Sequence, residues 1–230
     1  LGMLTSLSLP PFNYVIINFL TFSLFYIFLI KKLKSLKNKK LPFLYGWLFG
    51  FGYFASNLYW ISISLTFDEN FKFLIPFAIL LVPGFLSLFY ALAVYLFFVL
   101  KPKNNLSSFF LFSLIFGIIE FIRGSILTGF PWNLIVYSFS SQLEILNIIS
   151  IIGTYGFNLF CISLFTSPSL FILKDSKKDF SVCIAFLITI ISFYIFGLQN
   201  LEKFNKEQIK KLDFKIRIIS SNINIDRFYN

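Results

Sequence analysis

The sequence comprises 230 residues, of which 57% are apolar and 13% are charged, with 35 phenylalanines and no histidine. A typical soluble domain is about 45–50% apolar and about 25% charged, and a domain of this length has too little interior to bury the excess. The composition therefore excludes an ordinary soluble domain and points to a membrane. The net charge of +10 comes from lysine clusters between apolar runs, which is typical of membrane loops, and we expect no nucleic-acid partner.

Six apolar stretches approach the roughly 17–25 residues that a membrane-spanning helix needs. In chain order they are Phe12–Ile30, Phe43–Leu65, Phe73–Leu100, Leu106–Ile122, Ile148–Leu173 and Phe180–Leu198. Residues 1–9 are also apolar, and they have the character of the end of an earlier, truncated helix. We predict an all-α polytopic membrane protein with about six to seven transmembrane helices, in a transmembrane domain of residues 1–198.

Lysine clusters in alternate loops predict the orientation of these helices. The clusters are six lysines in Lys31–Lys40, two in Lys101–Lys103 and three in Lys174–Asp179. The internal loops on the opposite side carry Lys72 and Arg123, and four lysines after the last stretch weaken the asymmetry without reversing it. By the positive-inside rule, the lysine-rich side is cytoplasmic and the tail from Gln199 emerges on the far side, which in a bacterium is the periplasm.

The tail changes character twice. Residues 199–212 are polar and contain neither proline nor glycine, which predicts a linker or a short helix. In residues 213–230, Phe214, Ile216 and Ile218 alternate with charged residues, which is typical of a strand. A single strand cannot fold alone, so this segment either opens a soluble domain or forms an unstructured tail beside the membrane.

The most specific polar cluster runs from Glu120 to Asn133. Glu120 and Arg123 are three residues apart, so they share one helical face and can form an ion pair. Under one interpretation the pair is structural and precedes a Gly-Pro turn with Trp132 at the membrane interface. Under the other, Arg123 and the loop of residues 128–133 line a groove at membrane level, where the guanidinium holds a lipid phosphate.

Two further clusters contain closely spaced small residues. In Gly46–Ile61 the glycines favour close approach of another helix over contact with a ligand, although Asn57 and Trp60 could face a lipid-lined cleft. Gly153–Asn158 has the same ambiguity. The thiols of Cys161 and Cys183 lie in apolar runs, and we find no metal-ligand spacing, phosphate-binding loop or catalytic triad. We therefore assign no catalytic, metal-binding or cofactor-binding residue.

Taken together, these motifs resemble the apolipoprotein N-acyltransferase family of bacterial inner-membrane enzymes. In chain order the motifs are Pro10-Pro11-Phe12, Gly50-Phe51-Gly52-Tyr53-Phe54 with Tyr59-Trp60-Ile61, Glu120-Phe121-Ile122-Arg123-Gly124, Leu127-Thr128-Gly129-Phe130-Pro131-Trp132-Asn133 with Tyr137, and Gly153-Thr154-Tyr155-Gly156. The Thr-Gly-Phe-Pro-Trp-Asn run is the most specific of them. The strand-like segment of residues 213–230 is similar to the first strand of the family's nitrilase-like domain, although Ser220-Ser221 and Asn224 depart from the usual pattern.

The resemblance implies transfer of an acyl chain from a phospholipid donor to the N-terminal diacylglyceryl-cysteine of a lipoprotein. In the family, a nitrilase-domain Cys carries the acyl group as a thioester, with a Glu as base and a Lys stabilising the oxyanion. These three residues lie well downstream of the first strand and have no counterpart here. The resemblance thus implies a multi-pass domain of the bacterial inner membrane, inactive alone and dependent on a separate or downstream catalytic domain.

For the lipid groove we select Arg123, Thr128, Trp132, Asn133 and Trp60 as candidate residues, with Glu120 and Arg123 as a structural ion pair. Two other classes of protein remain as alternatives. One is a transporter or channel subunit that uses Glu120 and Arg123 along a polar pathway. The other is a membrane scaffold without catalysis.

Overall fold

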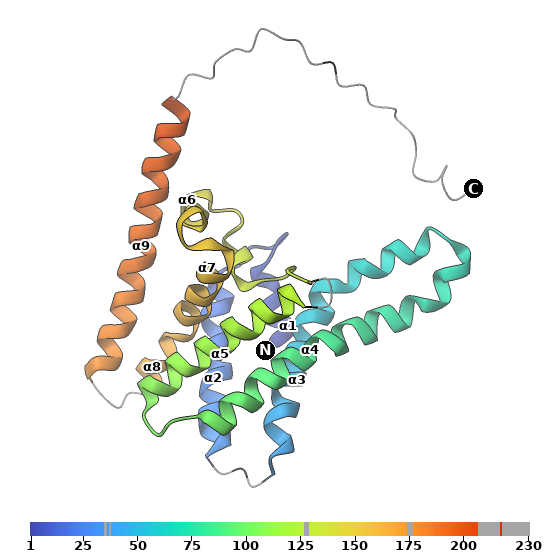
Figure 1. Cartoon of the computed structure of the whole chain (residues 1–230), viewed down its shortest axis with the longest axis horizontal. Helices are drawn as coiled ribbons and strands as arrows, with labels where there is room; N and C mark the ends of the chain where they lie inside the picture. Colours follow the sequence, from blue (N-terminus) through green and yellow to red (C-terminus); the bar gives the residue numbers. More distant parts are fainter. Residues whose placement is uncertain (35, 37, 127–128, 174–176, 207–216, 218–230) are drawn as a thin grey trace.

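The computed structural model describes residues 1–34, 36, 38–126, 129–173, 177–206 and 217, and the regular structure within these ranges is entirely helical (Figure 1). The long helices are α2 (Ile16–Leu33), α3 (Lys40–Leu58), α4 (Ile75–Leu100), α5 (Asn105–Ser125), α7 (Ile149–Thr166) and α9 (Lys177–Lys206). The short ones are α1 (Gly2–Thr5), η1 (Ser6–Ser8), η2 (Tyr59–Thr66), η3 (Glu69–Leu74), η4 (Ile135–Phe139), α6 (Leu143–Leu146) and α8 (Pro168–Leu173).

Five helical stretches of the described chain are long and apolar enough to cross a membrane. They are Ile16–Leu33, Glu69–Leu100, Asn105–Ser125, Ile149–Leu173 and Lys178–Lys206. The described residues thus support five spans, where the sequence predicted six to seven. The second predicted stretch, Phe43–Leu65, forms α3 and η2, and α3 falls short of the others because glycine, tyrosine, tryptophan and Asn57 lower its mean hydropathy.

The last helix continues beyond the predicted end of the transmembrane domain. Helix α9 passes through Gln199 and ends at Lys206, so half of the predicted linker is helical. The strand predicted in residues 213–230 lies outside the described residues, apart from Arg217.

Aromatic side chains fill the space between α2, α3, α4 and α5. The ring of Phe25 in α2 stacks on Phe49 in α3, with ring centroids 4.0 Å apart. On the other side, Phe116 in α5 packs edge-on against Tyr90 in α4 at 5.3 Å. Because aromatic pairs in such offset and edge-to-face arrangements attract one another beyond their buried area, they fix how these four helices pack.

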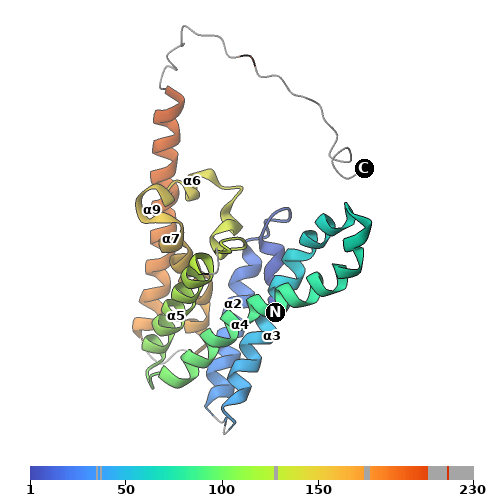
Figure 2. The ribbon, with the colours of Figure 1, turned by 45° about the vertical axis from the view of Figure 1, so that its right-hand side comes forward.

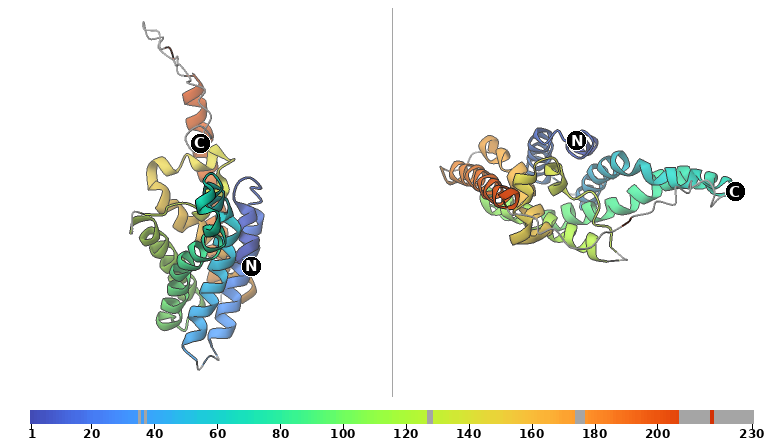
Figure 3. Two further views of the ribbon diagram at one scale, coloured as in Figure 1. Left: turned by 90° about the vertical axis from the view of Figure 1, so that its right-hand side faces the viewer. Right: turned by 90° about the horizontal axis from the view of Figure 1, so that it is seen from above.

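The helices form an elongated, narrow body when seen from above, with α9 at one end and the η2–η3 segment at the other (Figure 3). Helix α9 contributes little to the interior, since only 11% of its most apolar 18-residue stretch is buried. The turn from α4 to α5 lies at the same edge as the ends of α2 and α8, whereas α6 and the segment after α5 lie toward the opposite edge (Figures 1 and 2). The molecule therefore has two distinct ends along the helix direction.

The glycines of the Gly46–Ile61 cluster bring α3 into direct backbone contact with α4. A Cβ atom added at Gly46 would lie 2.4 Å from the carbonyl oxygen of Tyr90 and 2.8 Å from the Cα atom of Ala91. One added at Gly50 would lie 3.1 Å from the Cα atom of Ser87. The expectation that these glycines serve helix packing is confirmed.

We expect Gly46→Ala to destabilise the protein by about 1–3 kcal/mol, because the new methyl group would push against backbone that cannot move alone. The matched control is Gly84→Ala in α4, where the nearest atom to the new Cβ is 3.9 Å away, in the side chain of Trp47. That change should be neutral or stabilising, since alanine is favoured over glycine in helices. Thermal unfolding in detergent, followed by circular dichroism, compares the two, and equal stabilities would contradict this packing.

Candidate functional site

A buried ion pair lies at the end of α5. The Glu120 and Arg123 side chains are fully buried, and Arg123 Nη2 donates a hydrogen bond to Glu120 Oε2 at 2.5 Å. The two residues are three apart in one helix, so the turn itself brings them together. Pairing neutralises two charges that would be costly to bury separately in an apolar bundle.

The other end of the Arg123 guanidinium holds the segment that follows α5. Arg123 Nη1 donates hydrogen bonds to the carbonyl oxygens of Phe130, at 2.7 Å, and Trp132, at 3.0 Å. The Phe130 backbone N–H donates back to the Arg123 carbonyl oxygen at 3.2 Å. Gly129 takes a φ of +78°, and a Cβ there would lie 2.5 Å from the Gly124 carbonyl oxygen. The segment Gly129–Asn133, which we call the loop, is therefore folded back onto the last turn of α5.

Helix α3 holds the loop at its Asn133 end. The Tyr53 hydroxyl donates a hydrogen bond to the Asn133 carbonyl oxygen at 2.7 Å. The ring of Phe54 lies under the guanidinium, with its centroid 5.2 Å from Arg123 Cζ, in a cation–π arrangement. Tyr53 in turn stacks on Tyr90 of α4, at 6.1 Å between ring centroids. Both ends of the loop are thus tied to buried side chains.

Helix α7 contributes through the Gly153–Asn158 cluster. The backbone N–H of Val136, in η4 just after the loop, donates a hydrogen bond to Asn158 Oδ1 at 3.0 Å. Tyr155 packs over Gly124, where an added Cβ would lie 1.8 Å from its hydroxyl oxygen. The sequence left this cluster open between packing and ligand contact, and these contacts show that it fixes the segments on either side of the loop.

The loop forms part of the wall of two cavities. The larger has a volume of about 600 Å³ and is lined by Leu9, Pro10, Trp60, Pro131, Trp132, Asn133, Tyr137 and Ser140. The other, of about 370 Å³, is lined by Leu81, Val82, Phe85, Leu86, Phe89, Arg123, Ile126, Gly129 and Phe130. We call them the tryptophan cavity and the α4 cavity. Volumes of this size are in the range of small-molecule sites.

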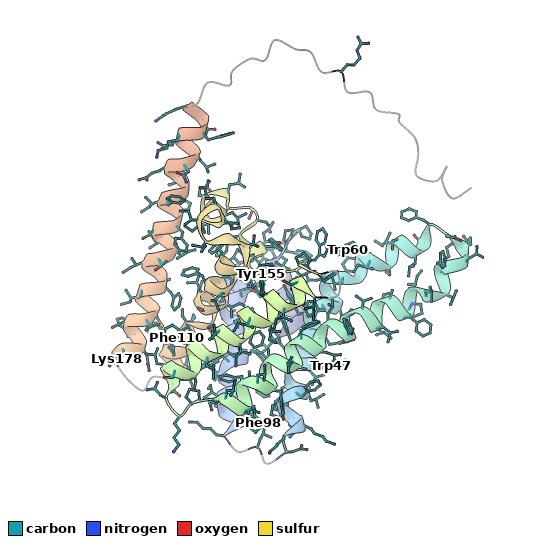
Figure 4. All side chains as sticks on the ribbon, in the orientation of Figure 1. Trp47, Trp60, Phe98, Phe110, Tyr155 and Lys178 are labelled. Atoms are coloured by element: carbon teal, nitrogen blue, oxygen red, sulfur yellow. The ribbon has the colours of Figure 1, made fainter. Side chains whose placement is uncertain are left out.

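The structure brings three of the residues selected from the sequence into one cavity. Trp60, Trp132 and Asn133 all line the tryptophan cavity, although Trp60 is about 70 residues distant from the other two in the chain. Arg123 borders the α4 cavity, but its side chain is almost wholly buried and engaged by Glu120 and the loop. Thr128 lies outside the described residues. Figure 4 shows Trp60 and Tyr155 toward the end of the molecule opposite Phe98.

Polar groups are few in the tryptophan cavity. Burial, followed by the effect of Tyr155, raises the pKa of Tyr137, so its hydroxyl stays protonated at neutral pH and can donate a hydrogen bond. Asn133 adopts a left-handed backbone conformation, with φ of 59°, and its buried Oδ1 accepts no hydrogen bond from any described residue. Such a site can hold and orient a largely apolar molecule with a few polar atoms.

Neither Tyr137 nor Asn158 was selected as a site residue from the sequence. Tyr137 belongs to the motif that contains Trp132 and Asn133, so it could have been selected together with them. Asn158 carries no such signal, because a lone amide in an apolar helix indicates equally a packing contact or a ligand. Among the residues that the structure describes, no group of three His, Cys, Asp or Glu side chains is placed to hold a metal ion.

Comparison with known proteins identifies one family. The family model "Apolipoprotein N-acyltransferase N-terminal domain" matches residues 1–167. Proteins named apolipoprotein N-acyltransferase are similar to the chain. One from Rhodopseudomonas palustris is 32% identical in an alignment of 234 positions that covers 100% of this chain and 43% of the relative. One from Rhizobium etli is 35% identical over an alignment that covers 81% of this chain and 36% of the relative. One from Rickettsia prowazekii is 32% identical over an alignment that covers 97% of this chain and 43% of the relative. The chain thus spans about two fifths of these relatives.

We expect Arg123→Met to destabilise the protein by about 3–5 kcal/mol, because Glu120 would remain as a buried charge without its partner. The double variant Glu120→Gln/Arg123→Met should recover part of that loss, since it removes the buried charge as well. It should still expose the loop to proteolysis, because the carbonyl oxygens of Phe130 and Trp132 lose their donor. Thermal unfolding and limited proteolysis in detergent measure the two effects.

The chain contains a matched control in Glu69 and Lys72, a pair with the same spacing and the same 2.5 Å separation but with exposed side chains. Lys72→Met should cost less than about 1 kcal/mol, as exposed pairs do. Two results would contradict the role given to the buried pair. One is a loss of stability in Lys72→Met as large as that in Arg123→Met, and the other is a double variant whose loop resists proteolysis as well as the wild type.

Proposed function

Because the chain belongs to the apolipoprotein N-acyltransferase family, we propose that it is the membrane domain of an enzyme of lipoprotein maturation. This enzyme transfers an acyl chain from a phospholipid to the N-terminal diacylglyceryl-cysteine of a bacterial lipoprotein. The match of the family's N-terminal domain to residues 1–167 is the observation that carries the proposal. In this proposal the chain anchors the enzyme and admits its lipid substrates, while a catalytic nitrilase-like domain supplies the Cys, Glu and Lys of the reaction.

The tryptophan cavity is the proposed place of lipid entry. Trp60 is 48% exposed and Trp132 is 58% exposed, so about half of each side chain is open to a molecule outside the protein. Amphipathic aromatic rings favour the boundary between lipid tails and head groups, which suits a site that receives a lipid from the bilayer. Asn133 and Tyr137 add the polar atoms that would orient an ester or a head group. Thr128 belongs to the same proposal by its position beside the loop in the sequence.

The geometry supports a positioning role for Arg123 rather than direct contact with a lipid phosphate. One terminal nitrogen of its guanidinium binds Glu120 and the other binds the two loop carbonyl oxygens. A phosphate would have to displace these partners from a buried site. Arg123 would therefore act on the substrate through the loop that it holds.

The lysine distribution supports an orientation in the bacterial inner membrane. Lys34, Lys101 and Lys178 all lie at the edge where α2, α4 and α8 end, whereas the loop lies toward the opposite edge (Figure 4). By the positive-inside rule the lysine edge would face the cytoplasm and the tryptophan cavity the periplasm. Helix α9 runs toward the cavity side, where a periplasmic catalytic domain would follow it.

A chimera tests this function. The chain is joined to the C-terminal remainder of the Rickettsia prowazekii relative, and acyl transfer from phospholipid to a diacylated lipopeptide is measured in detergent micelles. We expect the chimera to transfer the acyl chain and the chain alone to transfer none. In the chimera, Trp132→Ala or Trp60→Ala should raise the KM for phospholipid about tenfold, which corresponds to roughly 1.4 kcal/mol of lost binding.

Phe110→Ala is the matched control, because Phe110 is an aromatic residue of α5 that is 47% exposed and lines neither cavity. Its KM should equal that of the unmodified chimera. Acyl transfer by the chain alone would contradict the division of roles. An active chimera whose KM is unchanged by both tryptophan substitutions would contradict lipid entry at the tryptophan cavity, and ion conductance by the chain in a planar bilayer would favour a channel instead.

A further inference from the structure

A third cavity, of about 390 Å³, lies at the opposite end of the molecule from the loop. It forms where α2 ends, α4 ends and α5 begins. Its lining combines three lysines and an amide with a few apolar residues: Lys34, Lys101, Lys103 and Asn105 with Leu33, Phe98 and Pro102. We call it the lysine cavity. It is separate from the proposed lipid entry site, and acyl transfer gives it no role.

Within the part of the chain that the structure describes, the three lysines share this lining with no carboxylate. The chain has no acidic residue before Asp68 and none between Glu69 and Glu120, so neither the connection from α2 to α3 nor the one from α4 to α5 carries a carboxylate. Partial burial, together with the positive charge of Lys34, lowers the pKa of Lys101. Lys34 and Lys101 line the same cavity and repel each other there, and an anion between them would relieve that repulsion.

The wall is held in place by hydrogen bonds of its own. The Asn104 side chain caps α5 by accepting from the backbone N–H groups of Leu106 and Ser107, at 2.8 and 3.2 Å. Ser108 Oγ donates to the Pro102 carbonyl oxygen at 2.9 Å, and Asn105 Nδ2 donates to that of Leu173 at 3.1 Å. The turn that carries Lys101 and Lys103 is therefore fixed against α5, whose N-terminal end adds a partial positive charge.

Helix capping alone explains only part of this arrangement. Lys34 and Lys101 follow the C-terminal ends of α2 and α4, where a cation is favoured by the helix dipole. That effect acts at each helix end separately and does not require the lysines of two helices to share one cavity. Lys103 follows no helix end directly, yet it lines the same space.

We propose that the lysine cavity binds the phosphate group of an anionic phospholipid in the leaflet that these helix ends reach. Lysine ammonium groups are common phosphate ligands, and basic pockets between membrane helices on the lysine-rich side favour anionic head groups. A lipid is favoured over free phosphate because Leu33 and Phe98 are part of the lining and because Val99 and Leu100, next to Lys101, are 57% and 58% exposed. These side chains would contact the acyl chains of a lipid whose phosphate lies in the cavity.

Native mass spectrometry of the full chain in detergent tests this proposal, with phosphatidylglycerol and phosphatidylcholine as probes. Wild type should bind one phosphatidylglycerol about fivefold or more tightly than phosphatidylcholine, the effect of a single well-placed lysine near a head group. Lys34→Gln/Lys101→Gln should lose this preference. The control, Lys31→Gln/Lys40→Gln, removes the same charge from the same edge without touching the cavity wall and should keep it.

Three results would overturn the proposal. The first is equal affinity of the wild type for the two lipids, and the second is a control variant that loses the preference as fully as the cavity variant. The third is displacement of phosphatidylglycerol by millimolar inorganic phosphate. The last result would identify a site for free phosphate. If the cavity variant loses helical content, Lys103→Gln replaces it, because that exposed side chain contributes nothing to helix packing and should still lower the preference.

Discussion

A guanidinium buried at the end of a membrane helix needs partners, and the partners of Arg123 determine the geometry of the site. Glu120 neutralises its charge from within the same helix. The carbonyl oxygens of Phe130 and Trp132 accept from its other terminal nitrogen, so the loop must turn back over α5. A buried charge without a partner would lower the stability of the fold, so Glu120 is needed to keep Arg123 in place. Because Arg123 holds the loop and the loop lines the tryptophan cavity, both depend on this ion pair.

The two ends of the molecule are specialised in different ways. At one end, Tyr53, Arg123 and Asn158 bind backbone atoms of the loop and η4, which leaves Trp60 and Trp132 free to face a cavity. At the other, Lys34 and Lys101 line one cavity, and the described part of its lining contains no acidic residue. Both ends combine aromatic or aliphatic surface with a few polar groups, as expected where helices meet lipid head groups.

The sequence predicted the helical class, most of the spans and the pairing of Glu120 with Arg123, because spacing and hydropathy act locally. The three-residue spacing of Glu120 and Arg123 suffices to predict their pairing, and Gly46 and Gly50 suffice to predict a close helix contact. The partners contributed by other helices could not be predicted. Nothing in the chain indicates that Tyr53 binds the Asn133 carbonyl group, or that Lys34 lies beside Lys101, since these contacts depend on how distant helices pack.

The central claim is that the buried pair holds the loop so that a lipid can enter beside it. Electron cryomicroscopy of the chimera with an ether-linked phospholipid, which cannot donate its chains, tests it most directly. The account predicts lipid density between Trp60 and Trp132, with Arg123 still bound to Glu120 and to the carbonyl oxygens of the loop. Lipid phosphate density on Arg123 itself, with the loop released, would contradict the account.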